Sequence, residues 1–106
     1  MSSTVSELHR KRGNQFFAKV KQEENAAPVL RRGRLDDALK SYNQALATST
    51  TNDEYASAYK NLAVLHAYHV NNPVKNLTTE KDVQYCQKEC INSFGQAYTY
   101  GKKTHC

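Results

Sequence analysis

Residues that break helices are scarce in this sequence, which has 4 Gly and 2 Pro among its 106 residues and contains no Trp. This composition excludes a collagen-like chain and a Pro- and Gly-rich disordered chain, and it favours helices. No run of about 18 apolar residues is present, so we expect no membrane-spanning helix and no membrane partner. Because residues 1–12 contain no apolar signal-peptide core, we expect a cytoplasmic protein, with the nucleus as the alternative location.

Cysteine is also infrequent. The sequence contains Cys86, Cys90 and Cys106, an odd number in a chain without a secretion signal. Structural disulfides belong mainly to secreted proteins, so the sequence does not predict a disulfide framework.

Acidic residues are outnumbered only in the first third of the chain. Residues 1–34 contain 8 Lys and Arg against 3 Asp and Glu, whereas residues 35–106 contain 7 of each kind. The formal net charge of +5 therefore belongs to the first third. A local excess of cations attracts acidic peptides, phosphates or nucleic acid.

Apolar residues recur at three- and four-residue steps in four segments, which is the spacing of an amphipathic helix. The second segment is the clearest, because Leu35, Leu39 and Tyr42 lie on one helical face. Asp36 and Asp37 suit its first turn, where the helix dipole favours carboxylates. The expected helices span about residues 5–20, 35–46, 52–70 and 78–101.

Capping residues support the ends of these segments. Ser3 or Thr4 can cap the first helix, and Thr78 or Thr79 can cap the fourth. Gly101 is expected to end the fourth helix. The apolar lines predicted to face the core are Val5, Leu8, Phe16, Phe17 and Val20 in the first segment, and Val83, Cys86, Cys90, Phe94 and Ala97 in the fourth.

The links between the segments indicate how the helices pair. Residues 22–33 and residues 71–77 each contain a proline, whereas residues 49–52 form a short link. Short links make successive helices antiparallel neighbours. An apolar pair after Pro28 leaves open that the second helix begins at residue 28. The sequence therefore predicts an all-α domain of four or five helices in two antiparallel helix-turn-helix hairpins.

An internal repeat links the two hairpins, because the second and fourth segments superpose with a constant shift of 48 residues. In the first hairpin, Gly13 and Phe16 provide a small and an aromatic residue on the first helix. Ala38, Tyr42 and Ala45 form a small–aromatic–small line on the second helix. This pattern resembles the tetratricopeptide repeat. The third segment, which contains Asn61-Leu62-Ala63, resembles the first helix of a second repeat.

The resemblance implies one domain over residues 1–106, with the first repeat at about 4–48 and the second at about 52–102. Tetratricopeptide repeats are about 34 residues long, so both units here are longer than usual. The microtubule-interacting and transport domain, a three-helix bundle, is the alternative fold. Exposed repeat ends also leave room for self-association.

A protein-binding role follows from the resemblance to tetratricopeptide domains, whose first helices line a concave face. Some of these domains are co-chaperone adaptors that hold the acidic carboxy-terminal tail of a heat-shock chaperone in a carboxylate clamp. The clamp's motif falls here on Arg10, Asn14 and Asn61, while its remaining basic residues belong to a third repeat that this chain lacks. Phe17 and Leu65 complete the predicted peptide-binding site. The structural alternative is that both asparagines serve helix packing and that Arg10 is a solvated charge.

A second functional hypothesis is binding of nucleic acid or phosphate by a basic patch. Its cations fall in two groups along the sequence, with no recognisable RNA-binding motif around them. A solvated helix face also explains them. The predicted patch comprises Arg10, Lys11, Arg12, Arg31, Arg32 and Arg34.

Two histidines and two cysteines have spacings that would place each pair on one helical face. His66 with His69, and Cys86 with Cys90, would supply four zinc ligands if the two helices were adjacent. Both cysteines also fall at predicted core positions, where a free thiol behaves as a small apolar group. We therefore expect neither a metal nor a cofactor. The sequence contains no phosphate-binding glycine loop and no nucleophile elbow, so we do not expect an enzyme.

Overall fold

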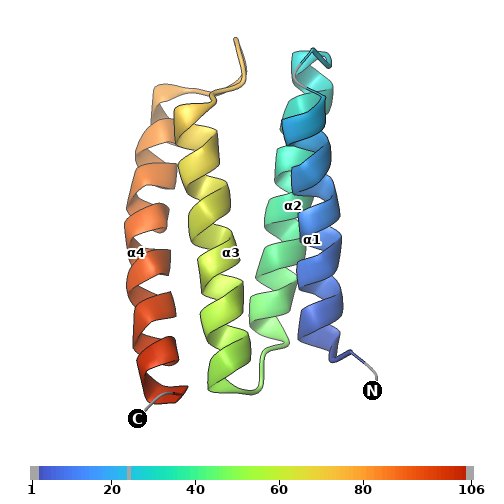
Figure 1. The fold of residues 1–106 in the computed structure, drawn as a ribbon. Helices are drawn as coiled ribbons and strands as arrows, with labels where there is room; N and C mark the ends of the chain where they lie inside the picture. The colour runs from blue at the N-terminus through green and yellow to red at the C-terminus, as the bar shows by residue number, and fades with distance from the viewer. Residues whose placement is uncertain (1–2, 24, 105–106) are drawn as a thin grey trace.

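The computed structural model describes residues 3–23 and 25–104, and this part of the chain folds into four helices (Figure 1). None of the described helices is both long and apolar enough to cross a membrane. The predicted all-α class is confirmed. The helices are α1 (Val5–Gln22), α2 (Pro28–Ala47), α3 (Asn52–Asn71) and α4 (Glu80–Thr104).

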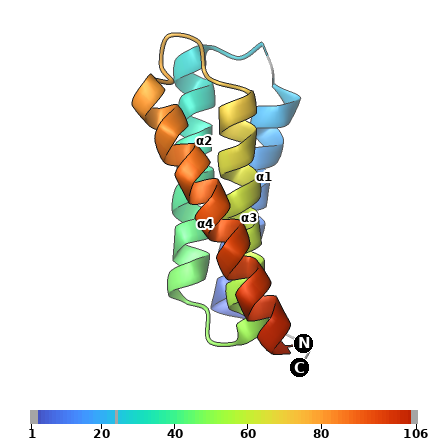
Figure 2. The same cartoon turned by 90° about the vertical axis from the view of Figure 1, so that its left-hand side faces the viewer.

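The helices form two antiparallel pairs, α1 with α2 and α3 with α4, as the sequence predicts. The second helix of the first pair also packs against α3, which joins the pairs into one body. Helices α1 and α3 run in the same direction and also touch each other. Seen from the side in Figure 2, α4 crosses α3 diagonally on the outside of the molecule.

Threonines cap three of the helices. Thr4 accepts a hydrogen bond from the backbone of Glu7 at the start of α1, and Thr51 caps α3 in the same way. Before α4, the Thr79 hydroxyl accepts from the backbone N–H of Asp82, whose carboxylate accepts from the Thr79 N–H. This reciprocal capping box satisfies two backbone donors. It confirms the predicted start of α4.

Helix α2 is longer than the clearest sequence pattern indicates. It begins at Pro28, so the second half of the expected 22–33 link is helical. Proline suits the first helical position because its ring fixes φ and it has no N–H to leave unsatisfied. Asp36 and Asp37 consequently lie inside the helix, and their predicted first-turn position is wrong.

Helix α4 passes through Gly101 and ends at Thr104, so the predicted stop at Gly101 is also wrong. The ring of Tyr100 stacks on Tyr55 and Tyr59 of α3, with ring centroids 4.8 and 5.8 Å away. These contacts hold the last turns of α4 against α3. Lysines at the end of α4 further favour the helical state, because cations stabilise a helix carboxy terminus.

The core lies where α1, α2 and α3 meet, and Tyr42 is its largest fully buried side chain. Two expected apolar lines run differently in the structure. In α4, Cys86 is buried as expected, but Ser93 is buried in place of Phe94. In α1 the side chains of Val5 and Leu8 are exposed. The remaining core residues include Phe17, Val20, Leu35, Ala38, Leu62, Leu65 and Val74.

Candidate functional site

The parallel helices α1 and α3 contact each other at two levels. At their amino-terminal ends, the Thr4 hydroxyl donates to a carboxylate oxygen of Glu54 over 2.7 Å. Toward their carboxyl ends, the rings of Phe17 and Tyr68 meet edge to face, with centroids 5.1 Å apart. The side of both helices between these contacts is called the α1–α3 face below.

Arg10 and Asn61 lie at the same level of the α1–α3 face. Each comes seven residues before a ring of the Phe17–Tyr68 contact, and a separation of seven residues returns to the same side of a helix. The Nε atom of Arg10 and the Nδ2 atom of Asn61 are buried, and neither has a hydrogen-bond partner among the described residues. A buried donor left unsatisfied costs about 1–3 kcal/mol, so both positions favour an oxygen acceptor.

Asn14 is tied to the helix behind it. Its Oδ1 atom accepts a hydrogen bond of 2.6 Å from the hydroxyl of Tyr42 in α2. Burial raises the pKa of Tyr42 to about 12, so this hydroxyl remains a donor. Because Oδ1 of the exposed Asn14 accepts this hydrogen bond, its Nδ2 group is directed away from Tyr42.

The two apolar residues of the predicted peptide site belong to the core. Phe17 has 7% of its surface exposed and Leu65 has 3%, so both offer little contact area to a peptide. The ammonium group of Lys21 lies 4.3 Å from the Phe17 ring centroid. The Arg31 guanidinium donates to the hydroxyl of Tyr68 over 3.5 Å. Arg10, Phe17 and Asn61 thus lie along this face, while Asn14 is tied to α2 and Leu65 lies in the core. Lys21 and Arg31 add two cations beside Phe17 and Tyr68.

The six residues of the predicted basic patch do not gather in one place. Arg34 pairs with Glu23 just beyond α1, about 20 Å along the helix from Arg10 at 1.5 Å per residue. Carboxylates also hold Lys11, paired with Glu7, and Arg32. Half of the patch is therefore neutralised locally, which weakens the case for a polyanion ligand.

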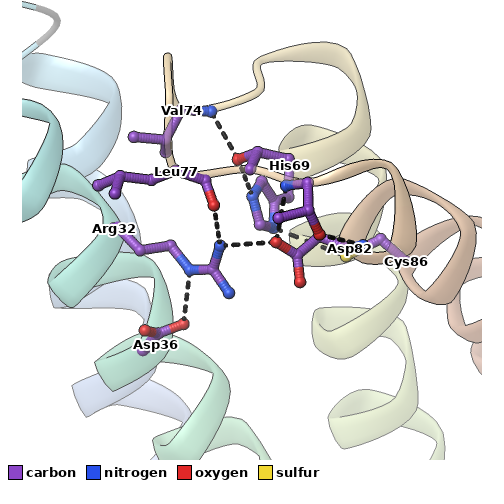
Figure 3. Close-up of polar contacts among 9 residues, drawn as sticks. Arg32, Asp36, His69, Val74, Leu77, Asp82 and Cys86 are labelled. Carbon is purple, nitrogen blue, oxygen red and sulfur yellow. Dashed lines mark hydrogen bonds and ion pairs between the residues drawn. The ribbon is translucent and has the colours of Figure 1, made fainter.

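A polar network joins α2, α3, α4 and the loop before α4 (Figure 3). The Arg32 guanidinium donates to Asp36 over 3.2 Å and to Asp82 over 3.1 Å. It also donates to the backbone carbonyl of Leu77 over 3.4 Å. Hydrogen bonds from the Thr79 backbone and from Arg32 lower the pKa of Asp82 to about 2. Arg32 thus ties α2 to the start of α4.

His69 connects the loop to α4 within this network. Its Nε2 atom lies 2.8 Å from the Thr78 hydroxyl, and its Nδ1 atom lies 3.6 Å from the sulfur of Cys86 (Figure 3). Burial and the nearby positive charge of Arg32 lower the pKa of His69. Burial raises the pKa of Cys86, so its thiol stays protonated and is a weak nucleophile.

The four residues considered as zinc ligands are not all brought together. His69 contacts Cys86, while the His66 ring packs edge to face on Tyr85 at 5.8 Å. Across residues 3–23 and 25–104, no group of three or more His, Cys, Asp or Glu side chains is arranged to hold a metal ion. A cavity of about 120 Å³ lies beside the network, lined partly by Leu35, Leu39 and Leu65.

Sequence reasoning missed several contributors to these sites. Lys21 is one of the basic residues of the first helix but was left out of the predicted peptide site, as was Tyr68. They lie four and three residues beyond Phe17 and Leu65, so extending the predicted face by one turn would have included both. The pairing of Arg32 with Asp82 links distant parts of the chain and leaves no local signal. Comparison of the chain with protein-family models, with curated proteins and with solved structures finds no match.

Proposed function

We propose that this chain is a tetratricopeptide-like adaptor domain that binds an acidic peptide segment on its α1–α3 face. The observation that carries the proposal is the pair of buried, unsatisfied donors on Arg10 and Asn61 at one level of this face. A peptide carboxylate or carbonyl oxygen would supply the acceptor that both groups lack. The resemblance of the Gly13 and Tyr42 region to a tetratricopeptide repeat supports the same choice.

The charges on this face favour an acidic ligand. Arg10 forms no ion pair within residues 3–23 and 25–104, and Lys21 and Arg31 contact aromatic groups rather than carboxylates. From Asn61 to Tyr68 the helix rises about 10 Å, which is the length of about three residues of an extended peptide. The face therefore suits a short extended segment with a carboxylate near Arg10.

Binding of a fluorescein-labelled peptide of about ten residues, rich in Asp and Glu and with a free carboxy terminus, tests the proposal. Replacing Arg10 removes a charged donor worth about 1.5–3 kcal/mol, so Arg10→Ala should weaken binding about tenfold or more. Asn61→Ala should weaken it several-fold. Arg12→Ala is the matched control, because Arg12 is exposed on another side of the same helix.

Two further arms identify what is recognised. A carboxy-terminally amidated peptide shows whether the terminal carboxylate matters, and a single-stranded RNA measured at two salt concentrations represents the competing function. Steep loss of RNA affinity with salt would indicate phosphate binding. Tighter binding of RNA than of peptide, or unchanged peptide binding by both variants, would refute the proposal.

A further inference from the structure

The outer side of α4 carries three large exposed side chains in a row. Ile91 is 76% exposed, Phe94 46% and Tyr98 72%. Their spacing of three and four residues places them on one side of the helix, over about 10 Å of its length. These three residues are called the α4 stripe below. In Figure 2 this helix lies outermost, with no other helix covering it.

The stripe continues into an apolar groove between α3 and α4. This groove has a volume of about 420 Å³ and includes Ala67, Val70, Cys90 and Ile91 in its lining. Gly95 lies within the stripe, and a β-carbon added there would meet nothing within 4 Å. A flat, open position beside large apolar side chains allows another backbone to approach closely.

The charged side chains one turn beyond each end of the stripe are both lysines. Lys88 lies one turn before Ile91 and Lys102 one turn after Tyr98, and both are exposed. Neither lysine forms an ion pair within the part of the chain that the structure describes. From residue 88 to residue 103 the sequence has one carboxylate, that of Glu89. It lies near enough to His66 of α3 to influence the pKa of that histidine.

We propose that the α4 stripe and its groove form a second docking site, which binds an acidic amphipathic helix of a partner protein. The partner's apolar side chains would pack on Ile91, Phe94 and Tyr98, and its carboxylates would meet Lys88 and Lys102. A helix laid in a groove with anchors at three- and four-residue steps is a common recognition mode.

A second copy of the chain fits this surface poorly. Antiparallel pairing of two α4 helices around Gly95 would place Lys88 opposite Lys102 of the other copy. Parallel pairing would place each lysine opposite its own equivalent. Like charges in an interface disfavour association, whereas an acidic helix neutralises both lysines. The groove beside the stripe also favours a helix with protruding side chains over a flat lipid surface.

The test uses two synthetic helical peptides of about 20 residues with identical leucine spacing, one with Glu and one with Lys at the flanking positions. Fluorescence anisotropy should show that the whole chain binds the Glu peptide at least tenfold tighter than the Lys peptide. Lys88→Glu with Lys102→Glu should reverse that order. Ile91→Ala with Tyr98→Ala should weaken binding of the Glu peptide at least tenfold.

Matched controls separate this site from other surfaces. Val29→Ala with Leu30→Ala removes exposed apolar groups on α2, and Lys60→Glu with Lys75→Glu reverses two exposed charges elsewhere. Both should leave binding of the Glu peptide unchanged. Circular dichroism verifies that every variant remains folded.

Several results would overturn the proposal. They are equal affinity for the two peptides, no binding of the Glu peptide at about 100 µM, and unchanged binding by the Ile91 and Tyr98 double variant. Sedimentation showing a dimer that this double variant dissociates would assign the stripe to a second copy instead. Binding to phosphatidylserine vesicles that is lost on reversal of Lys88 and Lys102 would assign it to a membrane.

Discussion

Gly13 of α1 lies directly against the ring of Tyr42 of α2. A β-carbon built on Gly13 would be 2.5 Å from Cε1 and 2.6 Å from Cδ1 of that ring, closer than van der Waals contact allows. Tyr42 has 1% of its surface exposed and is held by Asn14, so it has no free space to move into. The absence of a side chain at Gly13 is therefore what permits the close approach of α1 and α2.

Gly13→Ala should destabilise the protein. Overpacking a filled core costs about 1–3 kcal/mol, and this exceeds the roughly 0.5–1 kcal/mol that alanine gains over glycine inside a helix. Urea denaturation followed by circular dichroism measures the change in the free energy of unfolding.

Gly33→Ala is the control for this prediction, because Gly33 is helical and a β-carbon there meets nothing within 4 Å. It should stabilise the protein by about 0.5–1 kcal/mol through helix propensity alone. Equal effects of the two substitutions would mean that the Tyr42 ring can move aside.

Tyr42→Phe isolates the hydrogen bond from the steric contact. The substitution keeps the ring and removes the hydroxyl that donates to Asn14 over 2.6 Å. A loss of about 1 kcal/mol in the free energy of unfolding is expected, as for a typical intramolecular hydrogen bond. In the double variant with Asn14→Ala the effect of Tyr42→Phe should largely disappear, and additive losses would show that the two groups do not interact.

Local patterns were sufficient to predict most of the fold. The caps Thr4 and Thr79 and the apolar face of α2 depend on residues a few positions apart, and the structure confirms them. The errors come from contacts between helices. Phe94 was expected in the core, but the crossing of α4 over α3 turns Ser93 inward. Stacking of Tyr100 on Tyr55 of α3 stabilises the last turns of α4, so the helix continues past Gly101.

The α1–α3 face was partly predictable for a different reason. Seven-residue spacing places Arg10 with Phe17, and Asn61 with Tyr68, on common helical sides whatever the tertiary structure. The alignment of these two sides depends on parallel packing of α1 and α3, which followed only from the family resemblance. The apolar line of the first segment predicted the burial of Phe17, which the structure confirms, but the same line did not separate it from the exposed Val5 and Leu8.

Arg32 should contribute to stability through its tie between α2 and the start of α4. It has three acceptors on Asp36, Leu77 and Asp82, and it is only partly exposed. Arg32→Ala should lower the free energy of unfolding by about 1–2 kcal/mol, more than an isolated surface ion pair would contribute. Thermal unfolding compares it with Arg12→Ala, which should have little effect because Arg12 is exposed.

The two buried histidines should make stability depend on pH near neutrality. Burial lowers the pKa of His66 and is the main cause of the lowered pKa of His69, where Arg32 contributes as well. Below the ordinary value of 6.5 the unfolded chain binds protons more readily than the folded one, so the free energy of unfolding falls as the pH decreases. The slope is limited to about 1.4 kcal/mol per pH unit for each histidine.

Denaturation between about pH 7 and pH 5 measures this effect, and His69→Gln should make the decline shallower. The carboxyl of Asp82, with its pKa lowered to about 2, keeps its charge throughout this window and does not contribute to the slope. Adding His66→Gln should flatten the profile further. If the double variant retained the slope of the unmodified protein, the acid sensitivity would have to originate outside the polar network around Arg32 and His69.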